Sequence, residues 1–502
     1  MLLKQFLRIG LVGFSKKSCR SFTKQPDFTK NTYQIERGFY NYLQEPHLNY
    51  FKKILGDDGN RVITDESLLE HYNIDWFKNV KGSSKVVLKP KTTEEVSKIV
   101  SYCNANKLAV CTQGGNTGYS AGAVPVFDEV ILSMELMNQI LDIDVNSGNV
   151  VCQSGIVLEN LDNILAEKGM MVPLDLGAKG SCQIGGNVAT NAGGLRLVRY
   201  GNMHGNVLGL EVVKANGEVL DCLKVVRKDN SGLHIKNLFI GSEGTLGIIT
   251  KVALRCPIRP KTQHVAFLGL QNYEKVLKTL RKCRQDLDEI ISAIEVMDSL
   301  SLEWGEQHTK LSSPIGRYPY YLLIETSGSN EQHDEAKIQG FLESALNGHY
   351  ILNGVVTGEP SKVKSLWAIR ERLPEGFKNH GWVGMYDLSM PTDQFYNVVD
   401  ELRTYLKNSA DYVFGFGHLG DGNLHLHVIT KKYDKRLETD VEKFLMDKIL
   451  PMKGSMSSEH GLGFIKRKYL PAVNSSESYH FMTDLKKLLD PNRILNPYKV
   501  FP

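Results

Sequence analysis

Several nitrogen-bearing side chains near residue 420 have the spacing of metal ligands. In the stretch 423–427 polar and apolar residues alternate, so Asn423, His425 and His427 share one face of a predicted strand. His418 enters from the glycine-rich turn that precedes this strand. Imidazole is a common ligand of zinc and similar metals, and a catalytic zinc site uses three protein ligands plus an open position. The alternative is that these histidines are only hydrogen-bonded loop residues.

The natural third ligand lies downstream, where Glu459 and His460 stand between serine and glycine residues. A carboxylate can complete a zinc site that begins with two imidazoles. The sequence therefore predicts a divalent metal held by His418, His425 and Glu459. His460, next to the third ligand, has the chemistry of a general base.

The spacing of Gly415, Gly417 and Gly420 imitates a dinucleotide-binding loop. That fingerprint must open a helix. The residues after Gly420 alternate like a strand instead, so a nicotinamide site is not expected here.

The positive charge of the chain is concentrated at its N-terminus. The 502 residues have a formal charge of +4, and the first 26 contain six basic residues and no acidic one. The remainder is therefore close to neutral, and no basic face for nucleic acid is implied. The length predicts two or three domains with a substantial core.

The first 22 residues resemble a mitochondrial transit peptide, because apolar, basic and serine residues are mixed there without an acid. A secretory signal is the alternative, but Lys4 and Arg8 interrupt any apolar core. We therefore expect import into the mitochondrial matrix. No apolar run of about 20 residues is present, so no membrane span is expected. The eight scattered cysteines indicate reduced thiols rather than disulfides.

A glycine-rich loop at 113–122 follows a predicted strand at 109–112. Consecutive glycines allow positive φ and let backbone N–H groups converge on phosphate oxygens. Asn116 and Thr117 add side-chain donors. This loop is a candidate anion cradle, and an ordinary turn is the alternative. Before it, a strand is expected at 86–88 and a helix from Glu94, whose apolar residues recur at helical spacing.

Two further glycine-rich segments lie at 175–194 and 237–250. The first consists almost wholly of small and amide residues, which cannot fill a core but suit a backbone that lies against something flat and polar. A low-complexity linker is the alternative, but the strands predicted around the segment argue against it. Asn216 and Gly217 predict a hairpin between them.

From residue 262 onward the composition changes. Strands near 263–269 and 319–325 alternate with helices near 272–288 and 333–347. This order of elements predicts a separate α+β domain.

Taken in order, the motifs resemble a known family. The glycine-rich segments are similar to the FAD domain of the vanillyl-alcohol oxidase-type flavoproteins. With the histidine motifs added, the chain resembles the FAD-linked D-2-hydroxy-acid dehydrogenases, closest to the mitochondrial branch that oxidises D-2-hydroxyglutarate. The segments that support the resemblance are Gln113–Gly118, Pro173–Ser181, Gly185–Gly194, Gly241–Gly247, Gly417–His425 and Glu459–Gly461.

The resemblance implies an α+β fold. A PCMH-type FAD-binding domain of two subdomains is expected beside an α+β substrate-binding cap with an antiparallel sheet. The expected divisions are a transit peptide at 1–22, a helical lead-in at 27–84, the FAD domain at 85–260, the cap at 261–455, and a C-terminal segment at 456–502 that completes the active site and the FAD domain.

The resemblance also places the cofactor. It implies that the pyrophosphate of FAD lies on 113–118 and the flavin near 175–194. Many relatives attach FAD through a histidine in the first loop, and because Asn116 stands at that place here, non-covalent FAD is expected. The residues expected to contact FAD are Gly114, Gly115, Asn116, Thr117, Gly118, Asp175, Gly180, Ser181, Gly185, Gly186, Asn187, Thr190, Asn191, Gly193, Gly194, Gly244, Ile248 and Asn496.

The implied chemistry uses the predicted metal. Zinc would bind the hydroxyl and α-carboxylate of the substrate and lower the pKa of the hydroxyl. His460 would take the proton, and a hydride would pass to the flavin. Arg370 matches the clamp of the family for the substrate carboxylate, although the residues alone leave an ion pair on a helix surface as the alternative. His460 and Arg370 are thus the expected catalytic residues, and the expected substrate contacts are Arg370, His427 and His460.

Three positions depart from the hydroxyglutarate branch. The resemblance implies a threonine four residues after the clamp arginine, a lysine before a Tyr-Asp pair, and an asparagine two residues after the second metal histidine. This chain has Pro374, Met385 and His427 there. Loss of a cation and a hydroxyl weakens a site for the distal carboxylate, since each charged hydrogen bond contributes about 1.5–3 kcal/mol. A protonated His427 would compensate in part.

The substrate therefore stays open between D-2-hydroxyglutarate and D-lactate or another small D-2-hydroxy acid. A rival of a different class is a catalytically impaired flavoprotein subunit of a mitochondrial assembly. A zinc hydrolase would leave the glycine-rich segments unexplained. Electron-transfer flavoprotein is the expected electron acceptor. The sequence is silent on the oligomeric state, for which a homodimer is one option.

Overall fold

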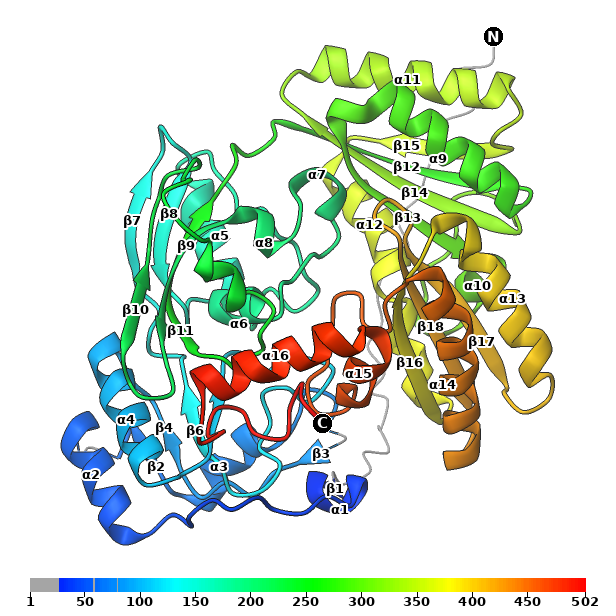
Figure 1. The fold of residues 1–502 in the computed structure, drawn as a ribbon. Coiled ribbons are helices and arrows are strands. Elements are labelled where there is room, and N and C mark those ends of the chain that lie inside the picture. The colour runs from blue at the N-terminus through cyan, green and yellow to red at the C-terminus, as the bar shows by residue number, and fades with distance from the viewer. Residues whose placement is uncertain (1–26, 57–58, 79) are drawn as a thin grey trace. The chain divides into compact units, whose positions relative to one another are not determined.

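The computed structural model describes residues 27–502, except 57–58 and 79. The fold has two compact units. The discontinuous unit combines the described residues up to Arg259 with Ser455–Pro502, and the inserted unit is Pro260–Gly454. Figure 1 shows the helices and strands of both along the chain. The predicted transit peptide lies outside the described residues.

One sheet of the discontinuous unit is mainly parallel. Its helix α4 (Thr93–Ala105) begins one residue before the predicted Glu94, because the Thr92 side chain caps it by accepting a hydrogen bond from the Glu95 amide. Val96, Ile99, Val100 and Cys103 are buried along one stripe of α4. The strand order is β2 (Val62–Ile63), β4 (Val87–Leu88), β6 (Val130–Ser133) and β5 (Val110–Gln113), with only β2 antiparallel to its neighbour.

The second sheet of this unit is antiparallel. The predicted hairpin at Asn216–Gly217 is confirmed: it joins two neighbouring strands, and Gly217 has φ +86°. Short helices α5 (Leu158–Ala166) and α6 (Ile184–Ala189) supply apolar residues to the core. The strand order is β10 (Val219–Cys222), β9 (Val207–Val213), β11 (Ile248–Arg255), β8 (Asn149–Gln153) and β7 (Ile140–Asp144).

The N-terminal lead-in is not wholly helical. It contains α1 (Thr29–Tyr33), α2 (Glu45–Leu55) and α3 (Glu66–Asn73), and Asp65 caps α3 by accepting from the Ser67 and Leu68 amides. Three strands accompany these helices, and β2 extends the parallel sheet. Strands of two residues are too short to show alternation, which is why the sequence pattern did not reveal them. The other two are β1 (Asp27–Phe28) and β3 (Val80–Lys81), which pair with each other.

Helix α16 (Ser476–Leu489) is anchored by a lysine. Lys486 is its one buried residue, whereas Phe481 and Leu488 are exposed. The Lys486 ammonium donates to the Asp490 carboxylate at 2.6 Å and to the carbonyl oxygens of Thr245 and Leu495. Burial lowers the pKa of Lys486, and Asp490 opposes that shift. Polar bonds therefore hold this helix against the glycine-rich segment around Thr245.

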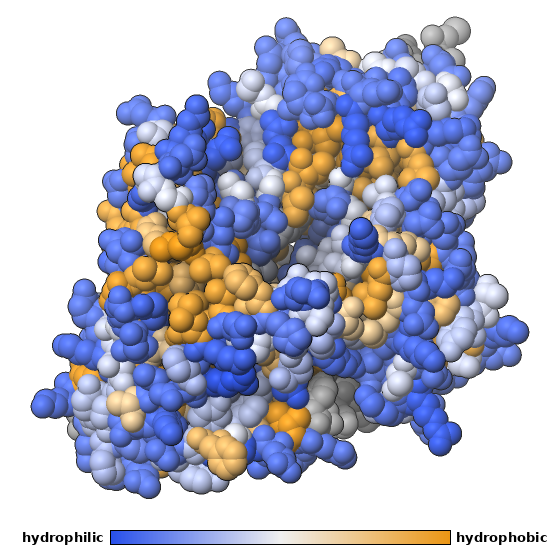
Figure 2. Space-filling view, in the orientation of Figure 1, coloured by the Kyte–Doolittle hydropathy of each residue, from blue (hydrophilic) through white to orange (hydrophobic). Residues whose placement is uncertain are grey.

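Some apolar side chains of the described residues are exposed at the surface. Figure 2 shows hydrophobic residues between hydrophilic ones on the visible face. Single exposed apolar residues are normal for a folded protein. Within the described part of the chain, no helix is both long enough and apolar enough to span a membrane.

The inserted unit is built on one seven-stranded sheet. Its first half follows a βαββαβ order with one extra helix between the second and third strands. In this common split arrangement the fourth strand lies beside the first. The helices α9 (Tyr273–Leu287) and α11 (Glu331–Asn347) contact each other and pack on the first and third strands of this half. In Figure 1 they lie side by side over this half of the sheet. The elements are β12 (Thr262–Leu270), α9 (Tyr273–Leu287), β13 (Ile291–Asp298), β14 (Tyr320–Gly328), α11 (Glu331–Asn347) and β15 (Asn353–Thr357), in sheet order β15-β12-β14-β13.

The second half repeats the start of this arrangement. β13 pairs with β17, which joins the two halves into one sheet of order β15-β12-β14-β13-β17-β18-β16. Two further helices lie outside these repeats: α10 (Ser299–Thr309) comes between β13 and β14, and α12 (Pro360–Glu371) comes between β15 and the second half. Its own elements are β16 (Trp382–Ser389), α13 (Phe395–Leu406), β17 (Tyr412–His418), β18 (Asn423–Thr430) and α14 (Lys435–Ile449).

A buried aspartate fixes the start of α11. Asp334 accepts hydrogen bonds from the Thr262 hydroxyl, the Asn330 amide and a ring nitrogen of His333. Burial raises the pKa of Asp334, but the bonds from Thr262 and His333 outweigh burial and hold its pKa below the ordinary 3.8. The stabilisation from Asp334 is therefore complete above pH 3.8 and is lost as the pH falls through the lower folded pKa.

We predict that Asp334→Asn lowers the free energy of unfolding by about 1–3 kcal/mol at neutral pH, because charged hydrogen bonds are replaced by weaker ones. The deficit should shrink below the ordinary pKa of the carboxyl. Urea unfolding of both proteins across that pH range measures it. Glu335→Gln, at an exposed neighbour in the same helix, is the control and should change little. A deficit independent of pH would refute the assignment.

Candidate active site

The register of the antiparallel strands arranges the predicted polar residues in rows. Residues directly opposite each other in such a sheet lie on the same face, and so do residues two apart along a strand. The predicted common face of Asn423, His425 and His427 is therefore confirmed. One row is Glu295, His418, Asn423 and Ser389; the next is Met297, Phe416, His425 and Asp387; the third is Phe414, His427 and Met385.

His418 and His425 are diagonal neighbours across β17 and β18. Their Nε2 atoms lie 3.2 Å apart, and their rings meet nearly edge to face. Two nitrogen ligands on a tetrahedral zinc ion, each about 2.0–2.1 Å from it, stand at about 3.3 Å. The pair therefore has the separation of two metal ligands, although a hydrogen bond between two neutral rings has a similar length.

Each imidazole of the pair has a carboxylate beyond its other nitrogen. Nδ1 of His418 lies 3.7 Å from Oδ2 of Asp421, and Nδ1 of His425 lies 4.0 Å from Oδ1 of Asp387. Asn423 donates to the same oxygen of Asp387 at 2.8 Å. Metal-bound histidines commonly direct their second nitrogen towards a carboxylate, which sets the tautomer and the ring orientation. The donor set fits a divalent metal.

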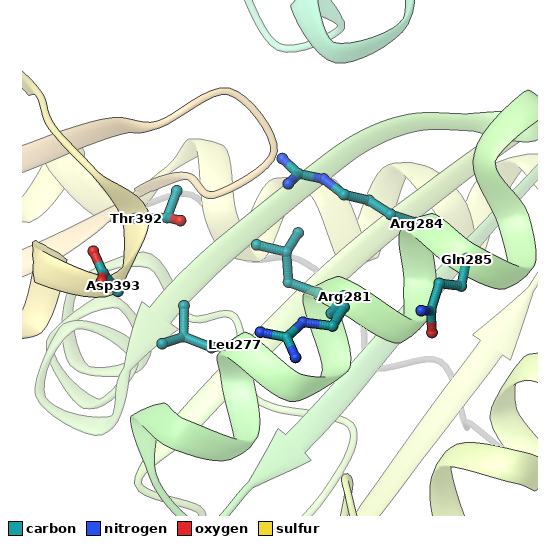
Figure 3. Close-up of a pocket in the computed structure, with 7 residues that line it drawn as sticks. Leu277, Arg281, Arg284, Gln285, Thr392 and Asp393 are labelled. Atoms are coloured by element: carbon teal, nitrogen blue, oxygen red, sulfur yellow. The ribbon is translucent and has the colours of Figure 1, made fainter.

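The turn after His418 is held from two sides. The amide of Gly420 donates to the Ile294 carbonyl of β13, and its carbonyl accepts from the Arg284 guanidinium at 2.9 Å. Figure 3 shows Arg281 and Arg284 on α9 opposite Thr392 and Asp393. These residues line a cavity of about 360 Å³ that contains none of the predicted site residues. One of its arginines thus supports the hairpin that positions His418.

No helix follows the Gly415–Gly420 segment. β17 ends at His418 and β18 begins at Asn423, so the glycines form a β-hairpin rather than a dinucleotide-binding turn. Gly417 is required there because a Cβ would lie 2.4 Å from the Asn423 carbonyl oxygen. The sequence-based rejection of a nicotinamide site agrees with this geometry.

Arg370 is a buried side chain and not a surface residue. It lies on α12, is 5% exposed, and donates from Nε to Oε2 of Glu295 on β13 at 2.6 Å. Its guanidinium also lies over the Phe416 ring, 4.8 Å from the centroid. The helix-surface ion pair that the sequence left open is therefore wrong. Arg370 and the imidazole pair converge on one face of the sheet.

His427 is enclosed by aromatic rings. It stacks on Phe416 with centroids 5.0 Å apart and planes 8° apart, and Phe377 lies at 4.9 Å. Met385 stands beside it on β16. Pro374, the third departure from the hydroxyglutarate branch, lies in the first turn of a 3₁₀ helix (Leu373–Asn379) and is exposed. Two of the three substituted positions therefore share the face that bears the histidines.

The glycine-rich segments form one groove in the discontinuous unit. It is lined by the loop after β5, the start of α6, the segment before β11, and residues near the C-terminus. His460 also lines it. The predicted cofactor residues in its wall are Gly114, Gly115, Asn116, Thr117, Gly118, Gly185, Gly186, Asn187, Thr190, Gly244, Ile248 and Asn496.

The groove contains buried polar atoms without partners. Within the described residues, Oγ1 of Thr112, Oγ of Ser154, Oε1 of Gln183 and Oδ1 of Asn187 have no hydrogen-bond partner. All four residues line the groove. Buried polar atoms normally find partners, because an unmade hydrogen bond costs about 1–3 kcal/mol. A ligand rich in donors and acceptors, such as the polar parts of FAD, fits this lining.

Two glycines let the backbone segments of the groove touch. A Cβ at Gly115 would lie 2.1 Å from the Ser181 carbonyl oxygen, and one at Gly185 would lie 2.5 Å from Cβ of Ser154. The first and second glycine-rich segments thus meet directly, and no larger residue fits between them.

Other predicted cofactor residues lie outside the groove wall. Asp175 pairs with Arg196 at 2.6 Å and with Lys179 at 3.2 Å. Asn191 accepts from the His204 amide. These two side chains support the loops around the groove. The remaining predicted residues absent from the lining are Gly180, Ser181, Gly193 and Gly194.

The comparisons with known proteins agree with the groove and the histidine face. Residues 84–223 match the FAD binding domain family, and residues 259–500 match the C-terminal domain of FAD linked oxidases. The mitochondrial D-2-hydroxyglutarate dehydrogenase of Danio rerio is 49% identical over 463 residues, which are 92% of this chain and 86% of that protein. The chain belongs to the FAD-linked D-2-hydroxy-acid dehydrogenases. FAD is therefore its cofactor and a small D-2-hydroxy acid its substrate.

Two further relatives of this dehydrogenase bear on its substrate. The Bos taurus protein of the same name is 48% identical, and the match covers 97% of this chain and 89% of that protein. A Schizosaccharomyces pombe protein named putative D-lactate dehydrogenase, mitochondrial, is 44% identical and covers 98% of both chains. These names agree with the predicted mitochondrial location.

Solved structures show the fold of this dehydrogenase at low sequence identity. p-Cresol methylhydroxylase superposes with a TM-score of 0.70 at 17% identity, over 92% of this chain and 98% of that one. Alkyldihydroxyacetonephosphate synthase superposes with a TM-score of 0.69 at 16% sequence identity, over 92% of this chain and 86% of that one. The predicted α+β architecture with a PCMH-type FAD domain is confirmed.

Glu243 also lines the groove, although no sequence motif predicted it. Its carboxylate accepts from the Leu462 and Gly463 amides at 2.7 and 2.8 Å. Burial raises the pKa of Glu243, and the two amide bonds oppose that shift. Ser120 donates to the Gly461 carbonyl at 3.0 Å. The position of Glu243 within the third glycine-rich segment was the one available signal.

The segment bound by Glu243 follows the predicted metal ligand Glu459 and the predicted base His460. Nε2 of His460 lies 3.6 Å from Oε1 of Glu459, and the Tyr119 ring lies 4.5 Å from that of His460. Both residues belong to the discontinuous unit, whereas His418 and His425 belong to the inserted unit. The structure thus unites two of the three predicted metal ligands within one unit.

We predict that Gly115→Ala lowers FAD content. The added Cβ meets backbone and forces the two segments apart, at a cost of about 1–3 kcal/mol in cofactor affinity. The ratio of flavin to protein absorbance of the purified enzyme measures it. Gly177→Ala is the control, because a Cβ there has no neighbour within 4 Å and Gly177 does not line the groove. Equal flavin content in both variants would contradict the prediction.

Proposed function

We propose that this dehydrogenase oxidises D-2-hydroxyglutarate to 2-oxoglutarate in the mitochondrial matrix, with FAD bound non-covalently and a zinc ion. The main support is the buried Arg370, which shares a sheet face with the closely spaced His418 and His425. An arginine beside two metal-type ligands suits a carboxylate that bears a neighbouring hydroxyl. The relatives named for D-2-hydroxyglutarate, at 47–49% identity, support the choice of substrate.

Different residues of the chain would have different roles in this reaction. His418, His425 and Glu459 would hold the metal, and Arg370 would bind the α-carboxylate through its terminal nitrogens. His460 would accept the hydroxyl proton, a general-base role that contributes about 10²–10⁴-fold. When bound, zinc supplies a Lewis acid for the hydroxyl, and the flavin supplies the hydride acceptor. The predicted cofactor residues of the groove would keep FAD in place and shield it from water.

The distal carboxylate of D-2-hydroxyglutarate needs a partner of its own. Of the three substituted positions, His427 is the one with a side chain that can become a cation, so we assign it that contact. Met385 beside it offers no charge, and the exposed Pro374 offers no donor.

D-lactate is the second candidate substrate. D-lactate has no distal carboxylate, so the absence of a charge at Met385 would not weaken its binding. The 44% identical Schizosaccharomyces pombe protein named putative D-lactate dehydrogenase supports this alternative. The two candidates require the same metal, base and arginine, and they differ only in the contact assigned to His427.

The proposal also includes an electron acceptor and an oligomeric state. We assign electron-transfer flavoprotein as the acceptor that reoxidises the flavin, and a homodimer is one option for the oligomeric state. The resemblance to the family supports the acceptor. Reduction of purified electron-transfer flavoprotein by the substrate-reduced enzyme tests it, and size-exclusion chromatography with light scattering tests the oligomeric state.

Anaerobic mixing with D-2-hydroxy acids tests the substrate. We predict that D-2-hydroxyglutarate bleaches the flavin absorbance near 450 nm faster than D-lactate at equal concentration. His427→Ala should slow bleaching by D-2-hydroxyglutarate about 10-fold or more, the weight of one charged hydrogen bond, and should leave D-lactate unaffected. Faster bleaching by D-lactate would favour the second candidate. No bleaching by any acid would favour the impaired-subunit alternative.

We predict that His425→Ala loses zinc but keeps FAD, because the groove lies in the other unit. Flavin reduction should fall by at least about 100-fold, since changing even an outer partner of a metal costs 10–100-fold. Elemental analysis and the flavin spectrum of one sample measure both effects. His333→Ala, at an exposed histidine of the same unit, is the control. Full zinc content in the His425 variant would exclude this residue as a ligand.

A further inference from the structure

Glu295 is a buried carboxylate that pairs with Arg370. It lies in the largely apolar strand β13 and is 0% exposed. A buried carboxylate is unfavourable unless it is paired and hydrogen-bonded. Its Oε2 accepts from Nε of Arg370 at 2.6 Å, so the pair partly neutralises two charges inside the inserted unit.

The pairing leaves one edge of the guanidinium open. Glu295 contacts Nε, and the guanidinium carbon lies over the Phe416 ring, 4.8 Å from the ring centroid. Among the residues that the structure describes, none accepts a hydrogen bond from the terminal nitrogens of Arg370. Those nitrogens form the fork that pairs with a carboxylate through two parallel hydrogen bonds.

Glu295 also faces the imidazole pair. Its Oε1 has no hydrogen-bond partner among the described residues and lies 3.9 Å from Nε2 of His418. The register of β13 and β17 puts these two residues directly opposite each other. One carboxylate thus lies between the arginine and the first histidine.

We propose that Glu295 is a positioning residue that fixes the Arg370 guanidinium, so that its terminal edge receives the substrate α-carboxylate beside the imidazole pair. The inference rests on the proposed function in one respect, namely that Arg370 binds that carboxylate. Without the acceptor, the long arginine side chain would choose among several rotamers and bind an anion less well, because preorganisation is lost.

A merely structural role is the competing explanation, and the chain offers a matched control for it. Glu325 on β14 is also 0% exposed and also ties down α12, because its Oε2 accepts from Nε1 of Trp367 at 2.8 Å. The two carboxylates therefore hold the same helix at points three residues apart. Removal of Glu325 weakens the docking of α12 but leaves Arg370 its acceptor.

The test measures ligand binding by the full-length, FAD-loaded enzyme without turnover. 2-Oxoglutarate or pyruvate is titrated in, and the change in the oxidised flavin spectrum gives the dissociation constant. Glu295→Met keeps the volume but removes the acceptor, and should weaken binding about 10- to 100-fold, the weight of one charged hydrogen bond. Glu295→Gln keeps an acceptor for Nε and should bind at least as tightly as the unaltered enzyme.

Two comparisons decide between the explanations. Glu325→Met should lower the unfolding temperature about as much as Glu295→Met, with an unchanged dissociation constant. Equal weakening of binding in both variants, or weakening by Glu295→Gln as severe as by Glu295→Met, would overturn the inference. If Glu295→Met gives no folded protein, Glu295→Asp replaces it, because its shorter side chain withdraws the acceptor and should also weaken binding.

Arg370→Ala separates failure of the inference from failure of the proposed function. If Arg370→Ala binds both 2-oxo acids as tightly as the unaltered enzyme, Arg370 is not the clamp and the proposed function is wrong at this residue. If Arg370→Ala weakens binding and Glu295→Met does not, the clamp stands and the positioning role is refuted.

Discussion

The antiparallel register of β13, β17 and β18 is the constraint on which the site depends. It places Glu295 opposite His418 and puts His425 on the same face, one row away. Side chains in a strand alternate between faces, so a slip of one residue would send both imidazoles to the opposite side of the sheet. The two bonds of the Gly420 backbone, to Ile294 and to Arg284, fix the turn that sets this register.

The protein buries several charges, and each one joins segments that are remote in sequence. Arg370 and Glu295 join α12 to β13, Glu243 holds the segment after His460, and Lys486 joins α16 to the third glycine-rich segment. A buried ion pair is seldom a large source of stability, because desolvation offsets most of the attraction. These contacts instead hold each loop in one orientation, which the glycine-rich backbone alone would not fix.

Local patterns in the sequence predicted much of this architecture. The alternation at Asn423–His427 gave the strand and its polar face, and the glycine-rich segments indicated a groove whose wall contains most of the residues named for FAD. The same reasoning excludes a dinucleotide-binding loop at Gly415–Gly420, because an alternating strand follows it. These features depend on neighbouring residues, so they can be recognised without knowledge of long-range contacts.

What the sequence did not reveal depends on contacts between distant residues. Glu295 is a single acid in an apolar strand, and its partner lies 75 positions away. Arg370 has the local sequence of an exposed helix residue, and only the sheet beneath α12 shows that it is buried. The groove atoms of Thr112, Ser154 and Gln183 come from separate elements without a shared motif. Two-residue strands such as β2 are too short to produce a periodic signal.

The insertion of one unit within the other has a consequence for how the holoenzyme is made. The flavin groove needs walls from both sides of a segment of some 195 residues, and Leu495 pairs with Val110 only after that segment has been passed. Closing so long a loop costs entropy that the cofactor contacts must help to offset. FAD binding therefore depends on the returning segment, because a chain that ends before Ser455 lacks His460 and Asn496 from the groove wall.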